Sequence, residues 1–146
     1  MRIFIAGIMQ GSRREKSIAA QDYRAQLTQV LRRHLDDVDI IDPFVLHPQS
    51  VTYTPEVARQ TLLALAEEAG DADVLIAFVP EASMGTAIEM WRAYCRQRLI
   101  YTISPLNENW VVRSLSTRVF PTPEAFMAFV ASGEFRRAIE SARTPP

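Results

Sequence analysis

The 146-residue chain has the length of one domain, and its 48% hydrophobic and 23% charged residues are typical of a folded protein. A net charge of −1 gives no electrostatic reason to expect a nucleic acid or an anionic membrane as partner. No apolar run is long enough to cross a bilayer, the first residues lack a signal-peptide pattern, and the single cysteine, Cys95, permits no internal disulfide. We therefore expect one cytoplasmic domain over residues 1–146.

Apolar runs of strand length alternate with longer segments of helical period in the first half of the chain. This alternation indicates a parallel sheet covered on both faces. The expected elements are a strand over 3–6 that stops at Gly7, a helix over about 19–35, a strand over 38–41, a loop over 44–54, and a helix from Pro55 to about Ala69 that Gly70 ends. In that last helix we expect Val57, Leu62, Leu65 and Ala69 to face inward.

The second half continues the same alternation. Its longest apolar run, 74–79, predicts the central strand. Around it we expect a helix from Thr86 to about Arg96, strands over 99–103 and 118–120, and helices over 123–130 and 134–142. Together these elements predict an α/β fold: a three-layer, flavodoxin/Rossmann-like arrangement with a parallel sheet of about five strands flanked by helices. Cys95, on the helix after residue 86, is expected to be a small buried residue.

The loop after the first strand has residues that suit a bound phosphate. Gly7 and Gly11 allow the backbone to approach a ligand closely, and Ser12 adds a hydroxyl. Arg13 adds a guanidinium group that can donate two parallel hydrogen bonds to a phosphate. The loop matches neither the Walker nor the dinucleotide-binding pattern. A glycine-containing turn with solvated arginines therefore remains an equal alternative.

A second candidate loop follows the central strand. Ser83 and Gly85 lie at the turn between strand and helix, and Glu89 lies about one turn into the helix. Its carboxylate can therefore face the crevice at the carboxyl ends of the strands, where ligands bind in open α/β sheets. A carboxylate there can act as a nucleophile at a sugar carbon or orient ribose hydroxyls. The alternative is a solvated glutamate that complements the helix dipole.

Three local patterns resemble the nucleoside 2-deoxyribosyltransferase family: the opening Ile-Phe-Ile-Ala-Gly, the segment Ala-Asp-Val-Leu-Ile-Ala at 72–77, and Ser83-x-Gly85-Thr86-x-x-Glu89. The nearest branch is that of the nucleoside 5′-monophosphate N-glycosidases. The resemblance implies that Glu89 attacks C1′ of the sugar and forms a glycosyl–enzyme intermediate. It also implies that Ser83 accepts a 5′-phosphate, since free-nucleoside transferases have an aspartate there.

The same resemblance implies the partners. The substrate is a nucleoside or nucleotide, without a cofactor, and the subunits form a homo-oligomer. No His, Cys or acidic spacing in the sequence indicates a metal centre. A residue after the fourth strand reaches the neighbour's 5′ group, and Asn109 and Ser114 are both candidates. Asp42 and His47, in a loop that can overhang the site, are either ligand contacts or loop structure, and Tyr23 and Trp91 are expected in the core or an interface.

One departure from the family pattern concerns leaving-group protonation. Relatives have an aspartate in the helix before the central strand, whereas this chain has no carboxylate over 61–66. Glu67 and Glu68 follow in a register that points elsewhere, and Asp73 is expected to orient structure rather than donate a proton. A catalytically silent nucleotide-binding or sensing module is therefore the alternative to an enzyme.

Overall fold

The protein is a parallel five-stranded sheet with helices on both faces, in a computed structural model that describes residues 1–10 and 20–143. The strand order β2-β1-β3-β4-β5 places β1 and β3 next to each other at the centre, and every neighbouring pair is parallel. This confirms the predicted α/β class and three-layer architecture. The strands are β1 (Arg2–Gly7), β2 (Asp39–Ile41), β3 (Val74–Phe78), β4 (Leu99–Ile103) and β5 (Arg118–Phe120).

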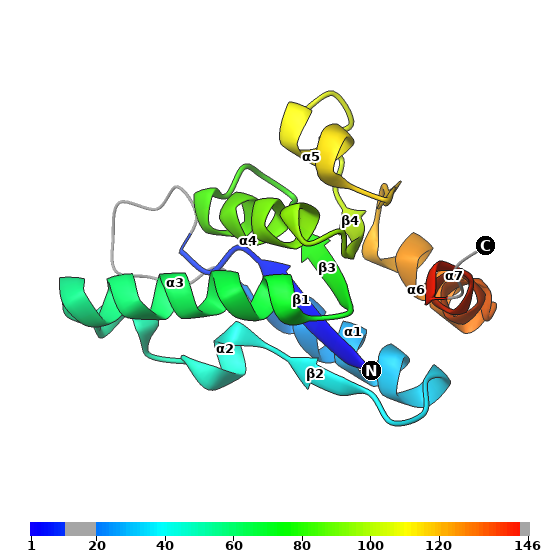
Figure 1. Cartoon of the computed structure of the whole chain (residues 1–146), viewed down its shortest axis with the longest axis horizontal. Coiled ribbons are helices and arrows are strands. Elements are labelled where there is room, and N and C mark those ends of the chain that lie inside the picture. The colour runs from blue at the N-terminus through cyan, green and yellow to red at the C-terminus, as the bar shows by residue number, and fades with distance from the viewer. Residues whose placement is uncertain (11–19, 144–146) are drawn as a thin grey trace.

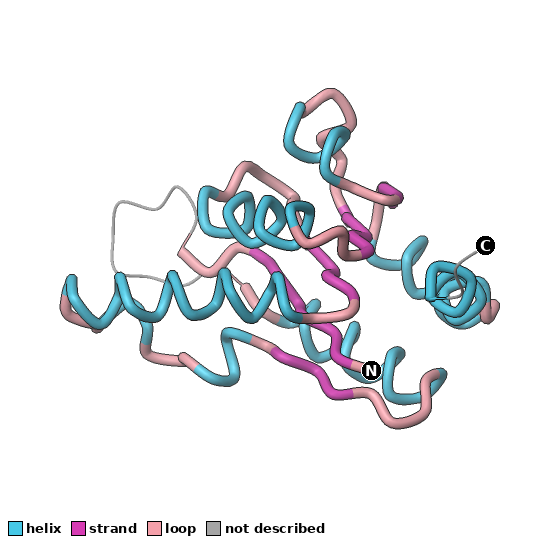
Figure 2. Tube along the Cα trace, viewed as in Figure 1, coloured by secondary structure: helices cyan, strands magenta, loops and turns pink. Residues whose placement is uncertain are grey.

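Helices from both halves of the chain cover the two faces of the sheet. In Figure 1, α3 and α4 lie in front of β1 and β3 and α1 lies behind them, while Figure 2 shows the strands enclosed between these layers. The helices are α1 (Asp22–His34), α2 (Pro43–Leu46), α3 (Pro55–Asp71), α4 (Met84–Cys95), α5 (Trp110–Leu115), α6 (Pro123–Ala131) and α7 (Glu134–Arg143), with a 3-10 turn at Ser50–Thr52.

The alternation of side chains along the strands divides the core into two layers. Ile3 and Ile5 of β1 face the layer that includes Leu27 of α1 and Phe126 of α6. Their neighbours on β1 face the other way, into a layer formed with Ala69 of α3 and residues of α4 and α5. Because both faces are apolar, β1 and β3 are continuous hydrophobic runs, as buried parallel strands are.

The site is positioned by the reversal of strand order between β1 and β3. The chain leaves β1 toward β2 on one side, and leaves β3 toward β4 on the other. Gly7, the last residue of β1, is paired with Phe78, the last residue of β3. In open α/β sheets a ligand crevice forms outside the carboxyl ends of the strands at such a switch point.

Several sequence-based expectations are corrected. The loop over 44–54 contains α2 and the 3-10 turn, because Asp42 caps Phe44 and Pro43 takes the first helical position. Helix α3 continues through Gly70, where a Cβ would lie only 3.0 Å from Cγ of Arg92 in α4. Val57 and Leu62 are about 40% exposed rather than inward, and Cys95 is exposed.

Candidate active site

Glu89 is buried at the carboxyl edge of the sheet. Ser83 caps α4 and precedes it in extended conformation, and this start of the helix places Thr86 and Glu89, three residues apart, on its inner face. Only 2% of Thr86 and 7% of Glu89 are exposed. A solvated, dipole-complementing role for Glu89 is therefore excluded.

Burial changes the charge state of Glu89. Loss of hydration raises the pKa of the Glu89 carboxyl to about 8, and the positive charge of Arg24 opposes this rise. No described residue donates a hydrogen bond to the carboxyl group. Glu89 is therefore mostly protonated at pH 7 in the free protein and becomes an anion, the form that can attack an electrophile, as the pH passes 8.

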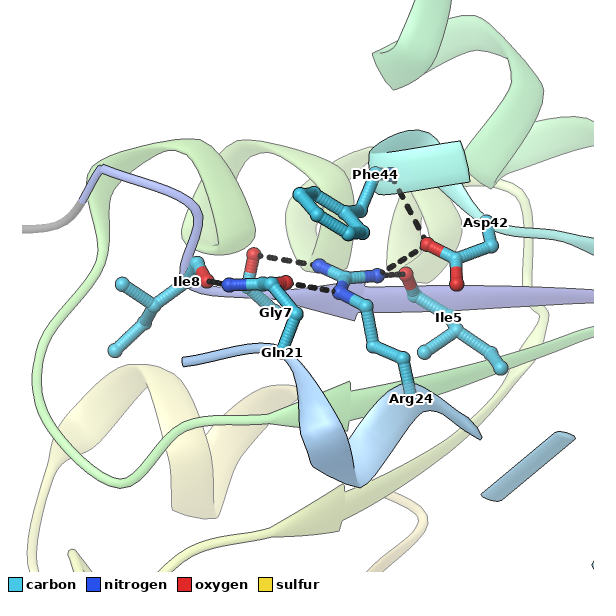
Figure 3. Close-up of polar contacts among 7 residues, drawn as sticks. All are labelled: Ile5, Gly7, Ile8, Gln21, Arg24, Asp42 and Phe44. Carbon is cyan, nitrogen blue, oxygen red and sulfur yellow. Dashed lines mark hydrogen bonds and ion pairs between the residues drawn. The ribbon is translucent and has the colours of Figure 1, made fainter. Parts of the chain in front are cut away.

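The buried Arg24 of α1 holds the end of β1 (Figure 3). Its Nη1 donates to the carbonyl oxygen of Ile5 at 2.9 Å and to Oδ1 of Asp42 at 2.8 Å, and its Nη2 donates to the carbonyl oxygen of Gly7 at 3.2 Å. Its Nε donates to the side chain of Gln21. This network connects α1, β1 and the end of β2, so that the strand end beside Glu89 has a fixed position.

Tyr23 fills the space that a side chain at residue 7 would occupy. A Cβ on Gly7 would lie 2.0 Å from the Tyr23 hydroxyl oxygen, and the ring packs on Phe78 with 4.1 Å between centroids. Burial raises the pKa of the Tyr23 hydroxyl to about 12. The charge of Glu89 also raises this pKa, by a smaller amount. Tyr23 is therefore a core residue, as expected, and its hydroxyl lies at the end of β1.

Ser83 and Asn109 meet at a pocket of about 350 Å³ between the start of α4 and α5. Ser83 Oγ accepts hydrogen bonds from the backbone N–H and the hydroxyl of Thr86. Asn109 caps α5, where its Oδ1 accepts from the N–H groups of Val111 and Val112. Thr86 also lines this pocket, whereas Glu89 does not.

The other sequence-based candidates have varied positions. Gly85 lies in the first turn of α4, and a Cβ added to it meets nothing within 4 Å, so packing does not require a glycine there. Ser114 is exposed and lines a different depression, beside Cys95. The three candidates of the first loop, Gly11, Ser12 and Arg13, lie outside the described residues.

Carboxylates that could replace the family's helix aspartate are engaged elsewhere. Glu67 forms ion pairs with Arg92 and Arg96 of α4, and Glu68 pairs with Arg2 at the opposite end of β1. Asp73 accepts from the backbone N–H of Arg2 at 2.7 Å and pairs with Arg143. Asp73 thus orients structure at the start of β1, as expected, and Glu67 and Glu68 are engaged in ion pairs.

The loop candidates Asp42 and His47 have structural partners. Asp42 pairs with Arg24 and caps Phe44, while Nδ1 of His47 is 2.9 Å from the Tyr53 hydroxyl. Within residues 1–10 and 20–143, no three His, Cys, Asp or Glu side chains form a group suited to a metal ion. No helix in the same part of the chain is long and apolar enough to cross a membrane.

Solved structures share this fold. A 2-deoxyribosyltransferase from the psychrotolerant bacterium Bacillus psychrosaccharolyticus superposes with a TM-score of 0.64 at 17% identity, over 87% of this chain and 90% of that one. A conserved protein from Enterococcus faecalis V583 gives 0.62 at 19%, and the Clostridium botulinum CMP N-glycosidase BcmB gives 0.56 at 16%; both cover 90% of this chain and 98% of theirs. No family model and no curated protein matches the chain. The chain thus has the fold of the deoxyribosyltransferases and N-glycosidases that its motifs resemble.

Two members of the site, Arg24 and Thr86, were not among the sequence-based candidates. An arginine in a helix is normally on the surface, so no sequence signal marks Arg24 as buried. Thr86 belongs to the motif that ends at Glu89. Thr86 and Glu89 are three residues apart in one helix, and this spacing predicts that both side chains lie on the same face.

Proposed function

We propose that this protein cleaves the N-glycosidic bond of a nucleoside 5′-monophosphate, with Glu89 as the nucleophile. The observation that carries the proposal is a buried carboxyl at the switch point of the sheet, in a fold that a deoxyribosyltransferase and a CMP N-glycosidase share. A buried carboxyl that receives no hydrogen bond from the described residues is costly to bury, and such groups concentrate at functional sites.

The reaction takes two steps. The ionised Glu89 oxygen forms a bond to C1′ while the bond from C1′ to the base nitrogen breaks, and its electron pair leaves with the base, which takes up a proton from solvent. Water then attacks C1′ and loses a proton to solvent while the bond from C1′ to Glu89 breaks, which releases Glu89 as a carboxylate and yields the free sugar 5-phosphate. A second base in place of water gives transfer instead of hydrolysis.

The pocket between the start of α4 and α5 supports a phosphate on the substrate. Ser83 uses its oxygen to accept two hydrogen bonds from Thr86, which leaves its own O–H without an acceptor among the described residues. It also lies at the N-terminus of the 12-residue α4, where the helix dipole favours an anion. Among the described residues, no carboxylate lines this pocket to repel a phosphate.

The test is liquid chromatography of nucleoside 5′-monophosphates incubated with the wild type, Glu89→Gln and Glu89→Ala. We expect the wild type to release free base and both variants to release none, with nucleosides cleaved more slowly than their 5′-monophosphates. Base release that survives both substitutions would overturn the role of Glu89.

The second candidate function is a nucleotide-binding or sensing module without turnover. It is favoured by the protonated state of Glu89 at pH 7 and by the lack of a second carboxylate acting on it among the described residues. It predicts that nucleotides raise the melting temperature by mass action while they remain intact on prolonged incubation. Detectable base release by the wild type would contradict it.

We further propose that the protein forms a homo-oligomer. Large apolar side chains of α4 and α5 are exposed to water in the single chain, and contiguous exposure of this kind is typical of an association surface. The exposed apolar side chains are Met84, Ile88, Trp91, Tyr94, Trp110 and Val111.

A nucleotide substrate and an exposed free thiol agree with the expected cytoplasmic location.

A further inference from the structure

The pocket between the start of α4 and α5 is mostly apolar. Seven of its ten lining residues are apolar, and the three polar ones are Ser83, Thr86 and Asn109. Met90 of α4 and Val112 of α5 line it as well; each is only 1% exposed and belongs to the core layer on this face of the sheet. The pocket therefore extends from the start of α4 to the apolar core.

This pocket is larger than a single phosphate requires. Its volume is about 350 Å³, and pockets from about 300 Å³ upward hold ligands of drug size. A phosphate is only one phosphorus atom with its oxygens. If Ser83 holds the 5′-phosphate, as proposed above, most of the apolar wall stays in contact with water. A ligand with apolar surface of its own is therefore favoured there.

The charges of the lining distinguish between kinds of phosphate ester. Among the described residues, neither a basic nor an acidic side chain lines the pocket. A phosphate monoester has a charge of about −1.5 to −2 at pH 7, and such an anion is usually bound by arginine or lysine. A diester has one negative charge, so it loses less hydration free energy in an apolar pocket. The lining thus suits a diester better than a monoester.

Two neutral donors in the lining suit an ester phosphate. Asn109 uses its Oδ1 to accept from two backbone N–H groups, and its amide nitrogen has no acceptor among the described residues. The Ser83 hydroxyl hydrogen likewise has no described acceptor. The oxygens of an ester phosphate accept hydrogen bonds, whereas an apolar side chain from a second copy of the chain does not.

The pocket and Glu89 follow one another along α4. Ser83 and Thr86 line the pocket, and Thr86 and Glu89 are buried residues of the same helix. Ser83 precedes Glu89 by six residues, which is about 9 Å along the helix axis. This separation is comparable with the reach of a nucleotide from C1′ to the oxygens of its 5′-phosphate. One substrate can therefore extend from Glu89 past Ser83 into the pocket.

We propose that the substrate is a nucleoside 5′-phosphodiester whose second ester group is apolar, and that this group fills the pocket between α4 and α5. The proposal rests on the proposed function, because the same Glu89 cleaves the bond to the base. The diester remains intact in the reaction. Glu89 bonds to C1′ as the base leaves with its electron pair, and water then releases a sugar 5-phosphate ester.

The experiment measures how binding depends on the length of the ester group. The probes are the methyl, butyl and hexyl esters of the four common nucleoside 5′-monophosphates, bound to Glu89→Gln in isothermal titration calorimetry. The three esters of one nucleotide have the same charge and differ only in apolar surface. For the nucleotide that binds best, we expect Kd to fall about 3- to 4-fold per added methylene, the ratio for a buried methylene group. In the wild type, kcat/KM for base release should rise in the same order.

A variant that fills the pocket assigns the effect to it. Ala87 lines the pocket, so Ala87→Phe in the Glu89→Gln background should abolish the gain in affinity with ester length. Ala64→Phe is the matched control, because Ala64 is an exposed alanine of α3 outside the pocket, and it should retain the gain. If Ala87→Phe does not fold, the ester series alone decides the proposal.

Equal affinity for the three esters, or weaker binding of the longer ones, would overturn the proposal. A gain that persists in a folded Ala87→Phe would also overturn it, since the ester group would then bind elsewhere.

Met84 and Val111 line the pocket and also belong to the proposed association surface, so a second copy is the competing occupant. Light scattering that shows dimers only for the chain with Ala87, together with no gain for longer esters, would assign the pocket to that copy and overturn the proposal. Affinity that rises with ester length in a protein that releases no base would instead overturn the proposed function alone. Base release without any dependence on ester length would overturn this proposal alone.

Discussion

Arg24 and Asp42 form an ion pair inside the protein, with 2.8 Å between Nη1 and Oδ1 and side-chain exposures of only 3% and 10%. The pair connects α1 to the end of β2, and the same guanidinium binds two carbonyl oxygens of β1. The strand end that carries the candidate site is therefore fixed by one charged side chain.

Removal of one partner of this pair should strongly destabilise the protein. Arg24→Met leaves Asp42 as a buried, uncompensated charge and should lower the free energy of unfolding by about 3–5 kcal/mol in urea denaturation. Arg136→Met is the control, because Arg136 pairs with Asp36 on the surface and should cost less than about 1 kcal/mol. Equal losses for the two variants would show that the buried pair contributes no more than a surface pair.

Gly7 should tolerate no side chain while Tyr23 retains its hydroxyl. A Cβ at residue 7 would lie 2.0 Å from that oxygen and 3.0 Å from the ring carbon that carries it. We expect Gly7→Ala to cost about 1–3 kcal/mol of unfolding free energy. The cost should be smaller in a Tyr23→Phe background, where the nearest atom is gone. A double-mutant cycle by urea denaturation measures this coupling, and strict additivity would contradict the packing described for Tyr23.

The raised pKa of Glu89 makes stability depend on pH in a defined direction. Between about pH 5 and 8 the unfolded chain has lost the Glu89 proton and the folded chain still holds it, so the free energy of unfolding falls as the pH rises. The fall attributable to this group is on the order of 4 kcal/mol, and it levels off above pH 8.

Glu89→Gln isolates this contribution, because glutamine does not titrate. The lowered pKa values of Glu67 and Asp73 affect stability at more acidic pH, below this window. Urea denaturation of both proteins from pH 5 to 9 should therefore show the variant gaining stability relative to the wild type as the pH rises. A difference that stays constant across the window would show that Glu89 has an ordinary pKa.

The proposed association surface makes a prediction about oligomeric state. Trp91 is 57% exposed on α4 and stacks with Tyr94 of the same helix, 6.1 Å between ring centroids. If copies pair through this face, Trp91→Glu should place an unpaired charge in the interface and reduce the mass measured by light scattering to that of one chain. A wild type that is already monomeric at high concentration would refute the homo-oligomer.

The sequence predicted the frame of the fold because its strands are continuous apolar runs. The bounds of β4 and β5 were predicted to the residue, and the central position of β3 follows from the longest of these runs. Helix α5 was missed, since six residues capped by a single asparagine give little helical periodicity. Gly70 was misread as a helix end because the contact with Arg92 that favours a small residue there comes from another helix.

The candidate site was predicted only in its local part. Ser83 and Glu89 could be linked because they belong to one turn and one helix, where spacing determines direction. Arg24 and Tyr23 could not be linked to Glu89, since they lie more than 60 residues away and come to the site through the pairing of β1 with β3. The burial that raises the pKa of Glu89 depends on the same tertiary contacts and has no local signature.

A covalent bond between Glu89 and the sugar can be observed by mass spectrometry of acid-quenched reactions. The wild type is mixed with a nucleoside 5′-monophosphate that it cleaves, quenched within the first turnover and digested. We expect a peptide containing Glu89 that is heavier by one sugar-phosphate group, and no such peptide from Glu89→Gln. Base release accompanied by a sugar adduct on a different residue would show that Glu89 is not the nucleophile.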